Sequence, residues 1–356
     1  MSFKVDQTLL DTAERLFVDL SAAPSAELKC GADDWPQWSR IQEAGFGSLL
    51  VPENAGGFGG SWVDVQAVMA RAGFHALALP LGETIVVHGL LARAGVTAPD
   101  GPSSFSCDCS GAIFSRPEAG GASFSGDIRG VPWGRAVRHV LFELREAHGT
   151  VCALAEVDSQ ATITRKTNMA GEPRDELRLI GARITRVPSF AHGLFSLGAL
   201  LRVAQMSGAL ERVLDLSVLH AGNRVQFGRP LAQFQVIQQQ LALMAEEAAA
   251  VDCASRAAAR AAECGDAGFE IAAAKLRANQ AVACAAAIAH QCHGAIGVTM
   301  EHALQSFTRR LWAWRAEFGN EDHWADWLGR FAQKASADGL WSLLTARGDR
   351  IAGQAG

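Results

Sequence analysis

The sequence predicts an α+β protein in which a helical block, a small β domain and a helical bundle follow one another along the chain. Helical spacing of apolar residues gives way near Gly101 to Ser, Gly and β-branched residues in alternation, and it returns after Pro188. We therefore predict an N-terminal helical domain over 1–103, a middle β domain over 104–188 and a C-terminal four-helix bundle over 189–356. Segregated blocks of this kind argue against an alternating nucleotide-binding sheet.

The N-terminal block opens with a predicted amphipathic helix. Asp6 is a typical capping residue, and the apolar positions after it have the spacing of one helix face: Leu10, Ala13, Leu16 or Phe17, and Leu20. Further helices are predicted over 35–44, from Ser61 onward and over 84–94.

The middle block contains short predicted strands separated by turns. Alternation or β-branched enrichment occurs over 122–126, 140–144, 151–157, 161–164 and 176–184. A block of this length has room for about six or seven short strands.

The C-terminal block consists of long predicted helices over 194–220, 230–264, 269–293 and 301–315. In the second of them, apolar residues recur at alternating intervals of four and three: Ile237, Leu241, Met244, Ala248 and Val251. That spacing is typical of a face buried in a helical bundle.

Composition limits the function. Hydrophobic residues make up 49% and charged residues 19% of the chain, which indicates a folded globular protein. The net charge of −5 argues against nucleic acid as a partner. No uninterrupted apolar run reaches the roughly 18 to 20 residues that a membrane-spanning helix requires, and residues 1–11 do not resemble a secretory signal, so we expect a cytoplasmic protein without a membrane partner. Eight irregularly spaced cysteines fit the reduced thiols of that compartment.

Three segments carry specific patterns. Residues 224–231 read Arg-Val-Gln-Phe-Gly-Arg-Pro-Leu, and residues 234–238 read Phe-Gln-Val-Ile-Gln. Residues 291–302 read Gln-Cys-His-Gly-Ala-Ile-Gly-Val-Thr-Met-Glu-His, and residues 51–59 read Val-Pro-Glu-Asn-Ala-Gly-Gly-Phe-Gly. These segments resemble signatures of the acyl-CoA dehydrogenase family, in the family's order and at its separations. The resemblance implies the family's fold and an oxidoreductase that desaturates an acyl-CoA thioester between its α and β carbons with FAD.

By this resemblance, six residues of the bundle hold the ADP half of FAD: Arg224, Gln226, Phe227, Gln235, Gln291 and Gly294. A guanidinium presents a planar charged fork to a pyrophosphate oxygen, and glycines at 294 and 297 let the backbone approach a dinucleotide closely. In the family this clamp serves largely the flavin of a neighbouring chain, so a dimer or tetramer is implied. Taken singly, Arg224 could equally cap helix carbonyls, but the set as a whole favours the cofactor.

The catalytic base is the main departure from the family. A carboxylate must take the α-proton while a hydride leaves the β-carbon for the flavin. The family's common position for it counts to Phe318, just before Gly319, and the other known position falls near Gly198 with no carboxylate close by. Glu317 is the remaining candidate, although a neighbour on a helix points about 100° away.

The middle domain departs as well. The family's T-E-P-x-x-G-S segment, which hydrogen-bonds the flavin ring, corresponds here to residues 105–111, Phe-Ser-Cys-Asp-Cys-Ser-Gly, which lack the pattern. The domain also looks short, so we expect its own flavin-ring pocket to be incomplete. Cys107 and Cys109 would face opposite sides of a strand, which favours structural thiols over a redox pair.

Two other motifs favour ordinary structure. The glycine run 56–60 has no Lys-Ser/Thr after it, so it predicts a turn and not a phosphate cradle. His290, Cys292 and His293 lie within one helical turn and have no second ligand pair at an expected spacing, so we expect no metal.

We therefore hypothesise a partner subunit that completes the FAD site of a homologous catalytic chain. The chain resembles subunits of the α2β2 acyl-CoA dehydrogenases of bacterial steroid and bile-acid side-chain degradation. The sequence of its segment 126–133 also resembles that subgroup. Electron-transfer flavoprotein is the electron acceptor that the resemblance implies. Three alternatives stay open: a self-sufficient homotetramer with Glu317, Glu246 or Glu247 as base, a flavin-free scaffold, and a flavin-dependent monooxygenase, which the weak middle domain disfavours.

Overall fold

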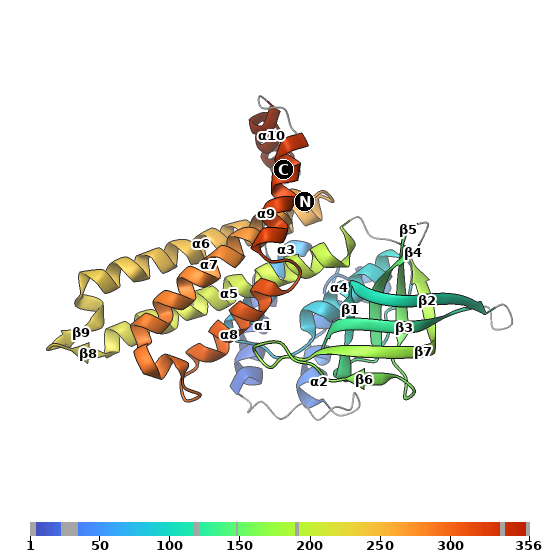
Figure 1. Cartoon of the computed structure of the whole chain (residues 1–356), viewed down its shortest axis with the longest axis horizontal. Helices are drawn as coiled ribbons and strands as arrows, with labels where there is room; N and C mark the ends of the chain where they lie inside the picture. The colour runs from blue at the N-terminus through green and yellow to red at the C-terminus, as the bar shows by residue number, and fades with distance from the viewer. Residues whose placement is uncertain are drawn as a thin grey trace. The chain divides into compact units, whose positions relative to one another are not determined.

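A computed structural model of the chain describes residues 5–22, 35–116, 121–146, 149–188, 192–334 and 339–353 (Figure 1). The chain divides into two compact units. The helical unit comprises Met1–Phe17, Trp62–Leu77 and Ala199–Gly356, and the sheet unit comprises Val18–Ser61 and Ala78–Gly198. Helices α1 and α5 contribute residues to both units.

The helical unit is built around three long helices and several shorter ones. Its elements are α1 (Gln7–Ala22), α3 (Trp62–Phe74), α5 (Gly193–Asn223), β8 (Val225–Gln226), β9 (Arg229–Pro230), η5 (Leu231–Gln233), α6 (Gln235–Glu263), α7 (Gly268–His293), η6 (Gly294–Val298), α8 (Leu304–Ala316), α9 (Glu321–Lys334) and α10 (Gly339–Gly353).

The sheet unit combines short helices with one seven-stranded sheet. Its elements are α2 (Pro36–Glu43), η1 (Phe46–Ser48), η2 (Glu53–Ala55), α4 (Leu81–Arg93), β1 (Ser103–Ser106), β2 (Asp108–Arg116), β3 (Gly121–Pro132), η4 (Gly134–Ala136), β4 (His139–Glu146), β5 (Gly149–Glu156), β6 (Thr162–Thr164) and β7 (Arg174–Val187).

The predicted fold class is confirmed: helices come first, a sheet lies in the middle of the sequence, and long helices follow. The predicted cap of α1 is also present, because the backbone N–H of Thr8 donates to the Asp6 carboxylate at 2.8 Å. Two C-terminal helices, α9 and α10, lie beyond the last predicted helix. The boundaries of the three predicted domains stay a prediction, since α3 belongs to the same compact unit as the C-terminal helices.

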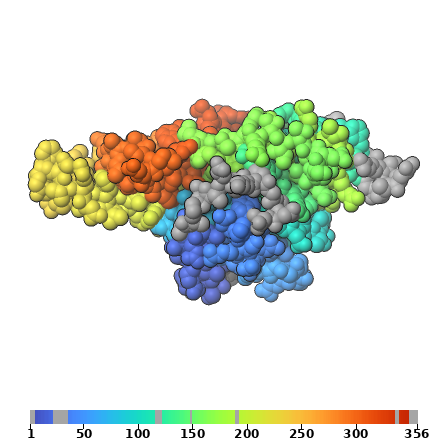
Figure 2. All heavy atoms as spheres, turned by 90° about the horizontal axis from the view of Figure 1, so that it is seen from below, coloured from blue at the N-terminus to red at the C-terminus, as the bar shows by residue number. Residues whose placement is uncertain are grey.

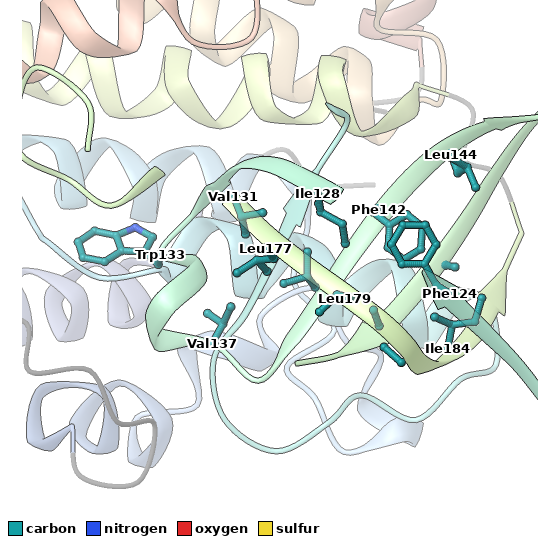
Figure 3. Close-up of a cluster of buried hydrophobic side chains, with 14 residues drawn as sticks. Phe124, Ile128, Val131, Trp133, Val137, Phe142, Leu144, Leu177, Leu179 and Ile184 are labelled. Atoms are coloured by element: carbon teal, nitrogen blue, oxygen red, sulfur yellow. The ribbon is translucent and has the colours of Figure 1, made fainter. Parts of the chain in front are cut away.

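The sheet has the strand order β1-β4-β5-β7-β3-β2, with β6 added beside β7. Only β1 and β4 among these pairs run parallel, and Phe105 lies opposite Leu141 in that register. Buried apolar side chains of β3, β4, β5 and β7 meet in one cluster, in which the rings of Phe124 and Phe142 lie 4.7 Å apart (Figure 3). This core explains why a small β domain is stable, because burying large aromatic side chains contributes most to core energetics.

The long helices of the helical unit are apolar because they form its interior. Helix α5 and the segment Gly268–Val298 are long and apolar enough to cross a membrane by length and composition, but 83% and 50% of their apolar windows are buried inside the protein. The predicted face of α6 is buried at Met244, Ala248 and Val251, whereas Ile237 and Leu241 are only half-buried. The N-terminal end of α6 therefore leaves part of its apolar face accessible.

Helices α3 and α5 pack closely because each places a glycine against the other's backbone. A Cβ at Gly208 would lie 1.7 Å from the Ala70 carbonyl oxygen, and one at Gly73 would lie 2.0 Å from that of Gln205. We expect Gly208→Ala to lower the free energy of unfolding by at least about 3 kcal/mol, because the two helices must move apart. Gly222→Ala, on the same helix with open space around it, should be neutral or stabilising by up to ~1 kcal/mol. Urea unfolding of both variants tests this, and equal stabilities would contradict the close crossing.

Candidate functional site

The Arg224 segment forms a hairpin at the end of α5. Strands β8 and β9 pair with Gln226 opposite Arg229, and Phe227 and Gly228 make the two-residue turn, both with positive φ (51° and 79°). Such a turn matches the twist of a hairpin, but positive φ is unfavourable for a residue other than Gly. Phe227 is nevertheless 91% exposed, so no intramolecular burial offsets its conformation. A strained, exposed aromatic residue at a hairpin tip is a feature of interaction sites.

The structure brings the six predicted cofactor residues to one end of the helical unit. Helices α6 and α7 run antiparallel, so the first turns of α6 lie beside the last turns of α7, and Gln240 donates a hydrogen bond to the Gln291 side chain at 3.4 Å. The space-filling view shows the hairpin, in yellow, at one end of the helical unit (Figure 2). All six predicted residues are solvent-exposed in the chain by itself.

The two glycines of the second motif have different roles. Gly294 has φ 63° and ψ −144°, a conformation that is almost restricted to Gly, and it ends α7. A Cβ there would meet open space, so the backbone at Gly294 remains approachable. Gly297 is buried, and a Cβ there would lie 2.9 Å from the Cβ of His293. The expected close approach to a dinucleotide therefore suits Gly294, whereas Gly297 is explained by packing within the chain.

Arg224 is suited to an external anion. Its side chain is exposed and has no hydrogen bond or ion pair within the described parts of the chain. The helix-capping alternative involves only its backbone: its N–H donates to His220, and its carbonyl oxygen accepts from Leu231. With the exposed amides of Gln226 and Gln235 nearby in sequence, these groups fit a diphosphate and its adjoining polar atoms.

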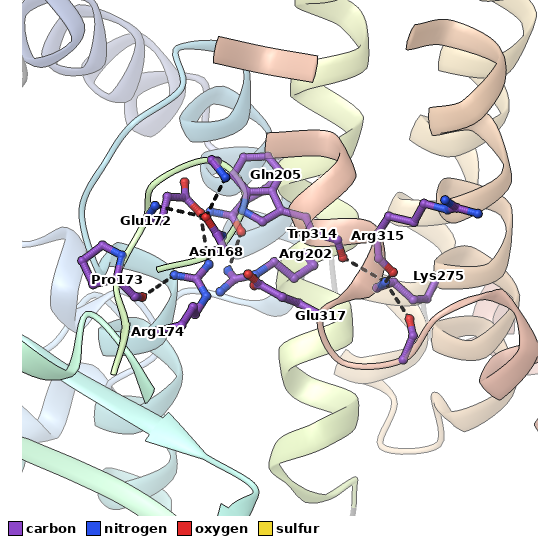
Figure 4. Close-up of polar contacts among 12 residues, drawn as sticks. Asn168, Glu172, Pro173, Arg174, Arg202, Gln205, Lys275, Trp314, Arg315 and Glu317 are labelled. Carbon is purple, nitrogen blue, oxygen red and sulfur yellow. Dashed lines mark hydrogen bonds and ion pairs between the residues drawn. The ribbon is translucent and has the colours of Figure 1, made fainter. Parts of the chain in front are cut away.

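Glu317, the candidate base, is held in an ion pair. It directly follows α8, and its carboxylate accepts a hydrogen bond from Nε of Arg202 at 2.7 Å (Figure 4). The Arg202 side chain is only 2% exposed and also donates to Gln205 at 2.6 Å. Phe318, at the family's usual base position, has φ 51°, and its ring lies 5.6 Å from the Arg202 guanidinium carbon. Arg202 was not among the predicted site residues, although a charged residue in the apolar stretch 194–204 of α5 is a visible signal.

This ion pair predicts a structural role for Glu317. Glu317→Gln should lower the free energy of unfolding by about 2 kcal/mol, because the buried Arg202 loses its counter-charge while one hydrogen-bond acceptor stays. Glu301→Gln, an exposed matched change, should cost less than about 0.5 kcal/mol. Urea unfolding measures both, and equal effects would show that the pair contributes nothing.

The segment expected to replace the family's flavin-ring motif uses its polar groups internally. The hydroxyl of Ser106 donates to the Arg129 carbonyl, and that of Ser104, which precedes the segment, donates to the Pro132 carbonyl, both at 2.6 Å. Ser106 also accepts from the N–H of Asp108. Burial raises the pKa of Cys107 to about 11 and that of Cys109 to about 12, so both thiols stay protonated and unreactive near neutral pH.

The glycine-rich loop 51–59 folds back on itself. The N–H groups of Gly57 and Gly59 donate to the Pro52 and Val51 carbonyls, so these donors do not form a phosphate cradle. Beside this loop lies a cavity of about 430 Å³, lined by residues between 38 and 56 and between 88 and 101, with none of the predicted site residues. Burial lowers the pKa of His88, which lines it, to about 4, and its Nε2 lies 3.2 Å from the Ser103 hydroxyl.

The His290–His293 segment does not converge on one point. His290 Nε2 lies 3.0 Å from the Thr308 hydroxyl, and the Cys292 thiol lies 3.8 Å from the Ser217 carbonyl. His293 instead lies beside His220 and His302, which come from elsewhere in the sequence. These three histidines were not predicted as a group, because His220 lies 73 residues before His293 in the sequence.

A family model and a characterised relative match this chain in sequence. The model of the acyl-CoA dehydrogenase C-terminal domain matches residues 189–331. Acyl-CoA dehydrogenase IpdE2 of Mycolicibacterium smegmatis is 25% identical over 318 residues, which cover 86% of this chain and 92% of that protein.

Solved structures give the same fold. A chain of the ChsE4-ChsE5 complex from Mycobacterium tuberculosis superposes with a TM-score of 0.83 at 22% identity, covering 95% of this chain and all of that one. A chain of the Tcur3481-Tcur3483 steroid ACAD, G363A variant, has a TM-score of 0.81 at 21% identity and covers 92% and 97%. At these identities the likeness establishes the fold alone.

Proposed function

Because this chain belongs to the acyl-CoA dehydrogenase family, we propose that it is the subunit that completes the FAD site of a catalytic partner in an α2β2 acyl-CoA dehydrogenase. Family members are oxidoreductases that act on a CH–CH bond. One observation carries the proposal: the six clamp residues lie exposed at one end of the helical unit, while Phe318 stands at the usual base position.

In this proposal, Arg224 binds the diphosphate of FAD, and the amides of Gln226, Gln235 and Gln291 bind its neighbouring polar groups. Phe227 contacts the cofactor or the chain that carries it, and Gly294 allows its backbone to come close. Bound FAD supplies the hydride acceptor for desaturation. The exposed tip of Phe227 and the half-buried Ile237 and Leu241 support an interface at this end, because an accessible apolar surface rimmed by polar groups suits a partner chain.

The partner supplies the base and the flavin-ring pocket. Internal use of the Ser104 and Ser106 hydroxyls and the Arg202–Glu317 ion pair support this division of roles. We propose a CoA thioester as substrate, with a steroid side-chain acyl group suggested by the steroid ACAD among the similar structures. We further propose cytoplasmic location and electron-transfer flavoprotein as the electron acceptor.

The test is the visible absorption spectrum and the mass of the protein, purified alone and after co-expression with a homologous acyl-CoA dehydrogenase subunit from the same genome. We expect the chain alone to be colourless and the mixed α2β2 complex to carry flavin. A yellow homo-oligomer would overturn the proposal in favour of a self-sufficient dehydrogenase. A colourless mixed complex would favour a flavin-free scaffold.

A further inference from the structure

Three histidines from separate parts of the helical unit meet at the clamp end. His220 lies in the last turn of α5, His293 is the last residue of α7, and His302 lies in the turn before α8. One ring nitrogen of each lies within 4.8 Å of the others. The His293 ring centroid is 4.4 Å from that of His220 and 4.8 Å from that of His302.

Two of these rings, those of His220 and His293, have a lone pair without a hydrogen bond in the described residues. His293 is 6% exposed, and its Nδ1 lies 2.8 Å from the Ala289 carbonyl oxygen, to which it can only donate. Its Nε2 therefore carries the lone pair, and this buried atom has no hydrogen-bond partner in the described residues. The side chain of His220 makes only ring contacts in the same parts of the chain.

A buried acceptor without a partner costs free energy, so a bound ligand that takes up the lone pair of His293 Nε2 would stabilise this cluster. Because Nδ1 of His293 donates to the Ala289 carbonyl, Nε2 offers the cluster a lone pair, which suits a cation and not an anion. Neutral imidazoles are instead typical ligands of zinc, and a ligating His commonly donates its other N–H to a backbone carbonyl, as His293 does to Ala289.

We propose that His220, His293 and His302 bind one Zn²⁺ ion, with water in the fourth position. A tetrahedral site needs ligand nitrogens about 3.3 Å apart, so the nitrogens must approach one another by up to about 1.5 Å. His302 Nδ1 accepts from the N–H of Leu304 at 3.1 Å, and zinc binding replaces this hydrogen bond. The ion would tie together the ends of α5 and α7, four residues before Arg224 and directly before Gly294.

The test uses the untagged full-length chain without flavin, so its outcome is separate from that of the proposed function. Co²⁺ serves as a spectroscopic substitute for zinc, and Zn²⁺ binding is measured by equilibrium dialysis. We expect one ion per chain and the strong visible bands of tetrahedral Co²⁺. His220→Ala and His302→Ala, both at partly exposed positions, should weaken binding by more than about 100-fold, beyond the loss typical for removing a ligand's hydrogen-bond partner.

His323→Ala is the matched control, since His323 is exposed and lies outside the cluster. It should bind the metal as the unaltered chain does. The proposal is overturned if the unaltered chain binds no Co²⁺ or Zn²⁺. It is equally overturned if both cluster variants keep the affinity, because the free cysteines would then be the ligands.

Discussion

Replacing Arg224 by Ala should weaken flavin binding by the mixed complex about 10- to 150-fold. A hydrogen bond to a charged group contributes about 1.5–3 kcal/mol, and the exposed Arg224 guanidinium has no competing partner in the described residues. The flavin affinity of Arg224→Lys should lie between those of the unaltered complex and Arg224→Ala, because an ammonium keeps the charge but loses the planar fork. Flavin absorbance per complex after extensive dialysis, with fluorescence titration of the stripped complex, measures the effect.

The control for this prediction is Arg256→Ala. Arg256 is another exposed arginine of the bundle, paired with Asp252 four residues earlier on α6 at 2.8 Å. Such surface pairs contribute only about 0.3–0.5 kcal/mol to stability, so flavin retention should not change. If Arg224→Ala retained flavin as well as Arg256→Ala does, the cofactor clamp would have to lie elsewhere.

Lys275→Met should lower the free energy of unfolding by at least about 3 kcal/mol. The three N–H groups of the buried ammonium are shared among four acceptors, the carbonyl oxygens of Trp314, Arg315 and Gly319 at 2.9–3.1 Å and Oδ1 of Asn279 at 2.7 Å (Figure 4). It thereby satisfies carbonyls at the end of α8, which have no partner within the helix. Met has a similar volume but no donor, and each buried carbonyl left without one costs about 1–3 kcal/mol.

Chemical unfolding measures this loss, with Lys334→Met as the control because Lys334 is exposed at the end of α9. The control should change stability by less than about 0.5 kcal/mol. Equal stabilities of the two variants would mean that water replaces the ammonium without cost.

The same residue predicts a dependence on pH. Burial lowers the pKa of Lys275 to about 7, whereas an unfolded chain keeps the lysine proton until about pH 10.4. Between these values the unfolded state binds more protons, so raising the pH favours the folded state. The stability advantage over Lys275→Met should therefore grow from pH 7 to pH 9 in unfolding experiments, and a constant advantage would place the folded pKa near its ordinary value.

Local patterns predicted the fold well, because they depend on neighbouring residues. The Asp6 cap, the alternation in β3 and the face of α6 each follow from spacing along one element. The ends of helices were less accurate: α4 begins at Leu81, three residues before the predicted start. The missed helix α9 had a readable signal, since Trp324, Trp327 and Phe331 recur at helical intervals.

The site was harder to predict, because it depends on contacts between distant residues. The motifs identified the clamp segments, yet the exposure of Phe227 and its left-handed backbone could be seen only in the three-dimensional structure. The ion pair that holds Glu317 joins positions 115 residues apart. Likewise, His220 and His293 belong to different helices, and spacing in the sequence gives no indication that their rings stack.

The internal hydrogen bonds of β1 have an evolutionary consequence. The Ser106 hydroxyl joins the Arg129 carbonyl to the Asp108 amide, so replacing this serine leaves two backbone groups to find new partners. Each hydrogen bond lost from a buried backbone group lowers the stability of the fold by about 1–3 kcal/mol. A substitution at Ser106 would therefore be tolerated only together with further changes that give both backbone groups new partners.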